Sequence, residues 1–353
     1  MKCVLLAAAA AGILCGQQPR LTNARLDTRM VSSGLDRDFR GIVSAETGAA
    51  WIGYAVRAVA GDHQMCCYST FQDDAGNRCC RGCSLGGTRS STAVTAPPGP
   101  VSLESSGDIF VLYRIEQHAV DRIRTFSADC ELDGGGLPVH WFTGVRAAES
   151  IALLTTFAEQ ADAERHLGEP ALAAIALHAD PAADAVLERF VAPGQPDSRR
   201  ERATFWLGRA RGRRGFEVLR HIVKEDPSEK VRDKAVFGLS VSKEAEALGV
   251  MIDVAKSDAS SHVRGQALFW LAHKAGQKAT GAITEAIEND PDTAVKKRAV
   301  FALQQLPVDE GVPLLIQVAR TNKNPVVRKQ AMFWLGQSND PRAVRFFEEV
   351  LLR

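Results

Sequence analysis

An internal repeat constrains this chain more than any other feature. Five segments between residues 199 and 336 contain the pattern A-x-F-x-L, and the copies follow one another at a constant interval, as Ala235 follows Ala203. A fixed period of about 32 residues is typical of stacked helix pairs, because one pair cannot bury its apolar faces alone. The alanines are Ala203, Ala235, Ala267, Ala299 and Ala331, the phenylalanines are Phe205, Phe237, Phe269, Phe301 and Phe333, and the leucines are Leu207, Leu239, Leu271, Leu303 and Leu335.

The repeat positions predict how each first helix is buried. At about 100° per residue, Val231, Ala235 and Leu239 lie on one face, whereas Phe237 points nearly opposite, toward a second layer. An apolar second helix such as GFEVLRHIVKED follows each first helix. A divergent copy over residues 171–190 and a capping helix over 146–161 extend the array, so residues 145–353 are predicted to form an α-solenoid of about six repeats.

The helix pattern V-R-x-x-A-x-x-x-L, followed by a short turn and an apolar helix, resembles the HEAT family, especially the phycobilisome-lyase-like short repeats. This resemblance implies a long surface that binds a partner. It also raises an enzymatic exception, deoxyhypusine hydroxylase, in which His-Glu dipeptides on the repeats hold two irons. Here no histidine is followed by glutamate, which removes that ligand pattern. We expect no catalytic residues, metal or cofactor.

The first residues resemble an export signal. In residues 1–16, MKCVLLAAAAAGILCG, one lysine precedes a short apolar run that ends at small residues, as in a secretory signal peptide. The run is too short to span a membrane, so we expect no transmembrane span in the mature chain and a periplasmic or extracellular location. Acylation of Cys15 as a lipoprotein is the alternative, and bulky Leu14 before it weakens that prediction.

The region between the signal and the repeats has a different texture. Residues 17–41 are polar and arginine-rich and predict a flexible arm. In residues 42–144, short apolar runs such as GDIFVLYRIE are separated by glycine, proline and serine, which predicts a small β-rich domain. The expected fold class is therefore an α+β multidomain chain, in which this domain precedes the α-solenoid.

Six cysteines remain after the leader, and all of them are in this β-rich domain. An even number in an exported chain favours disulfides, although the pairing cannot be read from the sequence. The alternative is metal or thiol chemistry at the CxxC pair Cys80 and Cys83, together with Cys79 and His63. The candidates are Cys66, Cys67, Cys79, Cys80, Cys83 and Cys130.

Two sets of residues in the repeats are candidates for partner binding. One is an arginine cluster. It is interpreted either as a solvated helix face or as a patch that binds anions. The other is a tryptophan that recurs in every second repeat. It is interpreted either as part of the core or as an exposed side chain that anchors a partner. They comprise Arg209, Arg211, Arg213, Arg214, Trp206, Trp270 and Trp334. A basic residue also recurs at one position of successive repeats, and we call this set the basic ladder. We expect it mainly to form hydrogen bonds between repeats, and partner binding is the less favoured role. Its members are Arg232, Arg264, Lys296 and Arg328.

We therefore expect an exported, non-enzymatic scaffold that binds a protein partner through the repeats. The alternatives are a metal- or thiol-dependent enzyme that uses the cysteines, and a cytoplasmic binder of nucleic acid or an acidic partner through the arginines. A net charge of +1 gives no general field for nucleic acid, and none is expected as a partner. Phe346, Phe347 and Leu351 in the last helix could also support end-to-end self-association.

Overall fold

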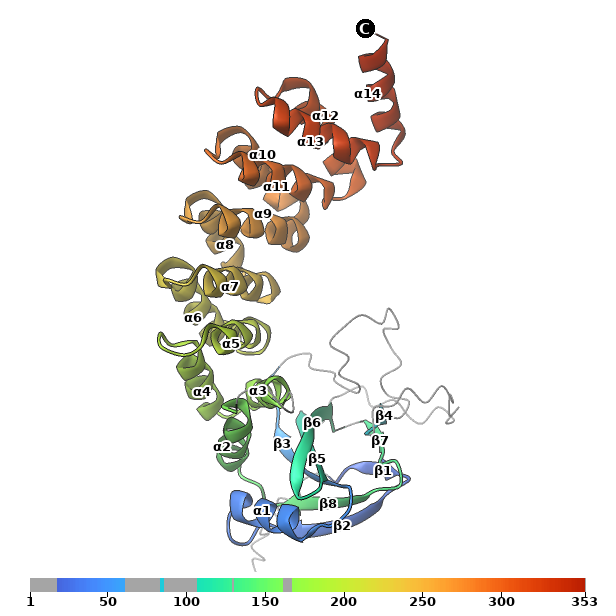
Figure 1. Ribbon diagram of the computed structural model, residues 1–353, viewed down its shortest axis with the longest axis vertical. Helices are drawn as coiled ribbons and strands as arrows, with labels where there is room; N and C mark the ends of the chain where they lie inside the picture. Colours follow the sequence, from blue (N-terminus) through green and yellow to red (C-terminus); the bar gives the residue numbers. More distant parts are fainter. Residues whose placement is uncertain (1–17, 61–82, 86–106, 129, 161–166, 353) are drawn as a thin grey trace, which may run out of the picture. The chain divides into compact units, whose positions relative to one another are not determined.

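The computed structural model describes residues 18–60, 83–85, 107–128, 130–160 and 167–352, with only the backbone at residues 83 and 84. The chain divides into two compact units, Met1–Ala183 and Asp184–Arg353. The first contains a β region with helices, and the second is a helical array (Figure 1).

The first unit is built on a five-stranded sheet with the strand order β2-β8-β3-β5-β6. The central strand β3 pairs parallel with β8 and antiparallel with β5, and β2 joins the edge parallel to β8. A smaller parallel sheet has the order β1-β7-β4. The strands are β1 (Arg20–Thr22), β2 (Arg25–Met30), β3 (Ala50–Arg57), β4 (Cys83–Ser84), β5 (Asp108–Glu116), β6 (Ala119–Ser127), β7 (Glu131–Asp133) and β8 (Pro138–Thr143).

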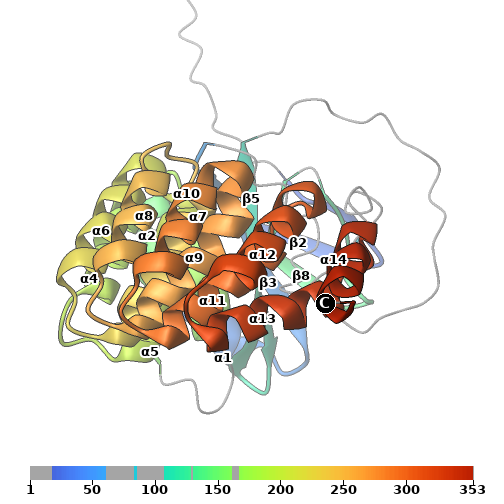
Figure 2. The ribbon, with the colours of Figure 1, turned by 90° about the horizontal axis from the view of Figure 1, so that it is seen from above.

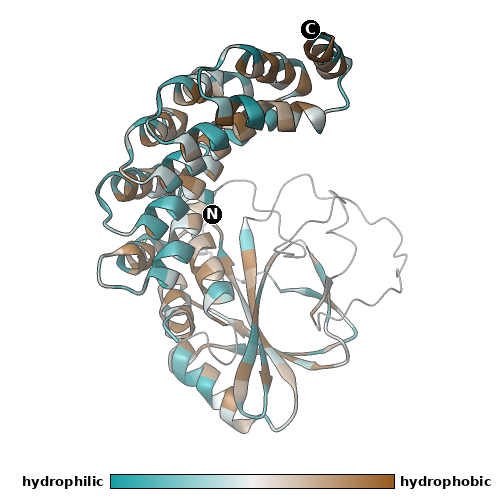
Figure 3. Cartoon of the chain, turned by 45° about the horizontal axis from the view of Figure 1, so that its top comes forward, coloured by the Kyte–Doolittle hydropathy of each residue, from teal (hydrophilic) through white to brown (hydrophobic). Residues whose placement is uncertain are grey.

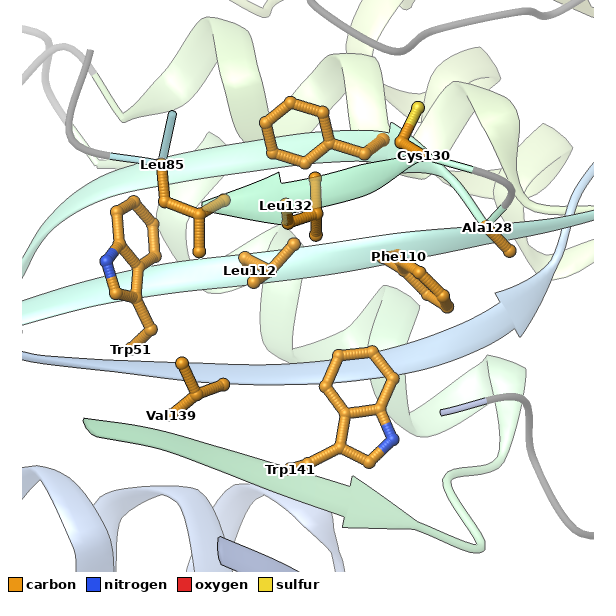
Figure 4. Packing of buried hydrophobic residues seen from close by; sticks show 10 residues of the cluster. Trp51, Leu85, Phe110, Leu112, Ala128, Cys130, Leu132, Val139 and Trp141 are labelled. Carbon is orange, nitrogen blue, oxygen red and sulfur yellow. The ribbon is translucent and has the colours of Figure 1, made fainter. Parts of the chain in front are cut away.

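Both faces of the larger sheet are buried, which explains why β3 and β5 are almost continuously apolar. One face carries Trp51, Phe110 and Trp141, which pack with Leu85 and Leu132 of the smaller sheet's segments (Figure 4). Tyr54 and Tyr113 lie on the opposite face, where the helices α1 (Leu35–Ala45), α2 (Ala147–Ala158) and α3 (Gly168–Leu177) pack.

Two boundaries differ from the sequence prediction. Residues 17–41 are predicted as an arm, but β1, β2 and the start of α1 lie there, because β2 completes its hydrogen bonds only by pairing with distant β8. The array is predicted to begin at residue 145, yet the division between units falls after Ala183. The reason is that α2 and α3 complete the core of the first unit, as the edge-to-face contact of Phe157 on α2 with Phe39 on α1 shows.

The second unit is an array of helix pairs in two layers. Odd-numbered helices form one layer and even-numbered helices form the other, and in each layer the helices follow one another along the array (Figures 1 and 2). The helices are α4 (Ala182–Val191), α5 (Asp197–Ala210), α6 (Gly212–Glu225), α7 (Glu229–Val241), α8 (Ala247–Ser257), α9 (Ser261–Ala275), α10 (Thr280–Asn289), α11 (Thr293–Gln304), α12 (Val308–Thr321), α13 (Pro325–Gly336) and α14 (Pro341–Leu351), with a 3-10 turn at Gly276–Ala279.

The repeat alanines and leucines are buried as the period predicts, but the phenylalanines are not. Ala235 and Leu239 are fully buried, and Phe237 is partly exposed. The residue between the repeat alanine and the repeat phenylalanine is buried instead, as Val236, Leu268 and Val300 show. The even layer packs beside the alanine face, so a side chain about 200° around the helix from the alanine emerges on the outer surface of the odd layer instead of entering a second interface.

Glycine allows the first helices of the odd layer to approach closely. A Cβ atom on Gly208 of α5 would lie 2.0 Å from the carbonyl oxygen of Gly238 on α7, so the two backbones touch. A side chain there would force the helices apart. Close packing in this layer places it on the inner side of the curve that the array follows in Figure 1.

Buried ion pairs tie successive repeats together. Arg232 donates two hydrogen bonds to Asp258, at 2.9 and 3.0 Å, and Arg264 does the same to Asp290, at 2.8 and 3.1 Å. Arg200 also pairs with Asp226, through a single hydrogen bond, and its Nε donates to the Val191 carbonyl. Each aspartate also accepts the backbone N–H two residues later, as Asp258 does from Ser260, and so shapes the turn before the next odd helix.

The structural role predicted for the basic ladder is thus confirmed for Arg232 and Arg264. Its later members use backbone carbonyls: Lys296 donates to Glu288 at 2.7 Å, and Arg328 donates to Asn322 at 2.8 Å.

Candidate functional site: the inner face of the repeat array

A continuous row of aromatic rings runs along the odd layer from α5 to α13. We call it the aromatic ribbon, and its members are Trp206, Phe205, Phe237, Trp270, Phe269, Phe301, Trp334 and Phe333. In that order, the centroids of neighbouring rings are 5.0, 5.6, 4.6, 4.9, 5.8, 4.9 and 4.9 Å apart. The two predicted sets, repeat phenylalanines and alternate tryptophans, therefore form one surface feature.

Phenylalanines of neighbouring odd helices are nearly parallel in two pairs. Phe205 stacks on Phe237 with 16° between the ring planes, and Phe269 stacks on Phe301 with 8°. Trp206 is buried, whereas most of the ribbon is partly exposed and Phe333 is 53% exposed. A half-exposed apolar row of this length is typical of a binding surface.

The C-terminal end of the ribbon adds a polar group and a cavity. Among the atoms that the structure describes, the buried indole N–H of Trp334 has no hydrogen-bond partner. The same side chain lines a pocket of about 490 Å3 with Leu303, Val308 and Leu315.

Ion pairs already engage most of the arginine cluster. Arg211 is buried and donates to Asp184 at 2.7 Å. Arg213 donates to Glu246, and Arg214 to Glu188. Arg211 thus has a structural role, whereas Arg213 and Arg214 are 55% and 64% exposed and their part in binding stays a prediction. Arg209 is exposed at the end of α5, and its part in binding stays a prediction.

A buried chain of hydrogen bonds in the first unit was not found by sequence reasoning. The hydroxyls of Tyr113 and Tyr54 are 2.7 Å apart, and Ser150 Oγ lies 2.8 Å from both Tyr54 OH and His178 Nε2. His178 Nδ1 lies 2.7 Å from the Ala174 carbonyl, which can only accept, so Nδ1 carries a proton. Burial raises the pKa of both tyrosines, so they stay protonated. This chain joins the sheet to α2 and α3.

A second polar group lies beside a pocket of about 400 Å3 between β2, β8 and α1. His140 Nε2 lies 3.0 Å from Glu46, and Nδ1 lies 3.4 Å from Asp27. The hydrogen bond to His140 lowers the pKa of Glu46, and Arg29 does most to lower that of Asp27. The Nε2 contact with Glu46 joins β8 to the end of α1, whereas Nδ1 makes no hydrogen bond among the described atoms.

Several predictions fall on residues that the structure does not describe. Residues 1–17 and Cys66, Cys67, Cys79 and Cys80 lie outside the described ranges, as does the Cys83 side chain, while Cys130 is buried in the first unit's core. The signal peptide, the disulfides and the thiol- or metal-enzyme alternative therefore stay predictions. Within the described ranges, no group of three or more His, Cys, Asp or Glu side chains is arranged to hold a metal ion.

The helices of the described ranges also lack a membrane-crossing candidate, since none combines the necessary length with a sufficiently apolar sequence. In the last helix, α14, Phe346 is buried, but Val344, Leu351 and Leu352 are exposed, and hydrophobic colour extends to this end of the array in Figure 3. Self-association through α14 stays a prediction.

The features of the second unit define a class, that of helical-repeat proteins. More specifically, residues 280–353 match the family model for HEAT repeats, and the shared period extends the same HEAT-like repeat back to α5. A search of curated proteins found no match.

Two solved structures share a distant likeness. Human deoxyhypusine hydroxylase in complex with glycerol has 16% sequence identity and a TM-score of 0.32, over 57% of this chain and 90% of that one. The complex of CpcE and CpcF of phycocyanin lyase from Nostoc sp. PCC7120 has 18% identity and a TM-score of 0.31, over 55% and 77%. Likenesses this weak give no argument about activity.

Proposed function

We propose that this protein is a scaffold that binds a protein partner along the aromatic ribbon on the inner face of its repeat array. The observation that supports this is the continuous, partly exposed row of rings on α5, α7, α9, α11 and α13. HEAT-type arrays offer extended surfaces, and binding energy at interfaces concentrates on a few aromatic and arginine side chains.

The ribbon is not required to hold the array together in the way that the alanine face is. Ala235, Leu239 and their equivalents are fully buried between helices, whereas Phe237 and Phe301 emerge on the surface of the odd layer. A large apolar side chain kept at the surface of every repeat is better explained by contact with a partner than by packing.

Site-specific photo-crosslinking in the native host tests the proposal. A photoreactive residue is introduced at one equivalent odd-layer position in three repeats, and at exposed even-layer positions as matched controls. The odd-layer positions are Lys234, Gln266 and Gln330, and the controls are Lys224, Asp253 and Gln317.

We expect one and the same protein to be crosslinked from all three odd-layer positions and from none of the controls. Each odd-layer variant is then combined with Phe301→Ala and Phe333→Ala. This double substitution should abolish the crosslinked products, because it removes two rings of the ribbon that the partner covers. Equal crosslinking from both layers, or products that survive the double substitution, would show that the partner docks elsewhere.

A further inference from the structure

Charge is divided between the two layers in the C-terminal half of the array. The odd helices α9, α11 and α13 contain seven lysines and arginines and no aspartate or glutamate. The even helices α10, α12 and α14 contain six acidic residues and three arginines. A surface of one sign attracts a partner of the opposite sign.

Not all seven cations are available to a partner. Arg264 pairs with Asp290, Lys274 donates to the carbonyls of Ser240 and Ser242, and Lys296 and Arg328 donate to turn carbonyls. Lys297 and Lys329 are exposed at equivalent positions one turn before Phe301 and Phe333. Arg298, beside Lys297, contacts Gln266 and His262 across the repeat boundary. These three cations border the ribbon.

We propose that the face of α9, α11 and α13 binds an extended acidic polypeptide segment, with apolar side chains against the ribbon and carboxylates at Lys297, Arg298 and Lys329. This inference rests on the proposed function and names the chemistry of the partner at that site.

The ring geometry favours a polypeptide over a single-stranded nucleic acid. Bases bind aromatic side chains by stacking on their faces. Here the faces of Phe269 and Phe301 are stacked on each other at 5.8 Å and 8°, and Phe301 also packs on Trp334. Contact between the rings thus occupies ring faces on which a base would stack.

Synthetic peptides of about ten residues test the inference, because that length spans three packed helices. The probe alternates leucine and glutamate. One control peptide replaces glutamate with glutamine, a second replaces leucine with serine, and a fluorescent oligothymidylate represents nucleic acid. Affinities are measured by fluorescence anisotropy on the full chain at low and at physiological salt.

We expect the leucine–glutamate peptide to bind about tenfold or more tightly than either control peptide, and its affinity to fall with salt. Lys297→Gln with Lys329→Gln should weaken this peptide about five- to tenfold, with little effect on the glutamine peptide. Lys224→Gln with Lys278→Gln, which removes two exposed lysines outside the odd layer, should change nothing. Circular dichroism checks that each variant is folded.

Binding of none of the peptides, equal binding of the glutamine peptide, or tighter binding of the oligonucleotide would overturn the inference. The proposed function would be judged separately by the crosslinks. If Phe301→Ala with Phe333→Ala removes them while peptide charge has no effect, the ribbon binds a partner that is not acidic.

Discussion

In the array, a buried ion pair joins residues 26 positions apart and recurs at successive turns, whereas in the first unit a buried hydrogen-bond chain joins Tyr54 to Ser150 across 96 positions and occurs once. The array thus depends on one contact used several times between neighbours. The first unit depends on different contacts between distant segments. Damage to a repeat should therefore stay local, and damage to the first unit should spread through that unit.

The largest effect is expected from Asp258→Ala in the array. The Asp258 side chain is 4% exposed and that of Arg232 is 13% exposed, so the substitution leaves a nearly buried guanidinium without its carboxylate. We expect a loss of about 3–5 kcal/mol of stability. Hydrogen exchange followed by mass spectrometry should show lost protection in α7, α8 and α9, with α1 to α3 unchanged.

Asp253→Ala is the matched control, because Asp253 is exposed on the neighbouring helix α8 and its removal should cost less than about 0.5 kcal/mol. If the two variants behave alike, the ladder does not hold the repeats together. If protection is also lost in the first unit, the contrast between local and spreading damage is wrong.

A smaller effect is expected from Tyr54→Phe in the first unit. This change removes the middle hydroxyl of the buried chain and leaves Tyr113 and Ser150 each without one partner. We expect a loss of about 1–3 kcal/mol, measured by urea unfolding, with protection reduced throughout the strands and α2. Tyr113→Phe keeps the bond between Tyr54 and Ser150 and should cost less. A loss confined to the residues next to Tyr54 would contradict cooperative unfolding of this unit.

The smallest effect is a pH-dependent fraying at the end of the array. Hydrogen bonds from the side chain and backbone of Arg342 lower the pKa of Asp340 to about 2, and Asp340 caps the start of α14. A carboxyl with a lowered pKa stabilises the fold above its unfolded pKa, near 3.8, and this contribution is lost as the pH falls through about 2.

We therefore expect α14 to lose helicity between about pH 4 and pH 2, as measured by the Cα chemical shifts of Ala343 and its neighbours. Asp340→Asn should remove most of that transition. Asp309→Asn, which changes an almost fully exposed carboxylate near Arg342, should not. A transition that survives Asp340→Asn would assign it to another carboxyl.

The sequence predicted the array better than the first unit, because the array repeats one set of contacts and the first unit does not. The positions of Ala235 and Leu239 recur in every copy of the repeat, so the period alone located the helices and their buried face. The period also located the repeat phenylalanines in the sequence, but it did not predict that they are partly exposed. Whether a side chain two positions after the alanine meets another helix depends on where the even layer packs, and that is a property of the assembled array.

In the first unit the apolar runs predicted strands, and β5 lies where one of them predicts it, but no period showed how the strands pair. Strand β2 reads as a polar, arginine-rich segment, and it becomes a strand only because β8, which comes much later in the chain, supplies its parallel partner. His178 has no neighbouring motif, and its partners Ser150 and Ala174 meet it through helix packing. The unmatched N–H of Trp334 and the division of charge between the layers likewise need the three-dimensional arrangement.

The spacing of the ion-pair ladder has a consequence for how such an array evolves. Arg200, Arg232 and Arg264 each stand 26 residues before an aspartate and recur every 32 residues, so tandem duplication or loss of one full period among the repeats that carry this pair recreates it. An insertion of another length within a rung would leave one guanidinium without its carboxylate. The ladder therefore permits changes in the number of repeats by whole units while selecting against partial ones, and the length of the binding face can vary in the same steps.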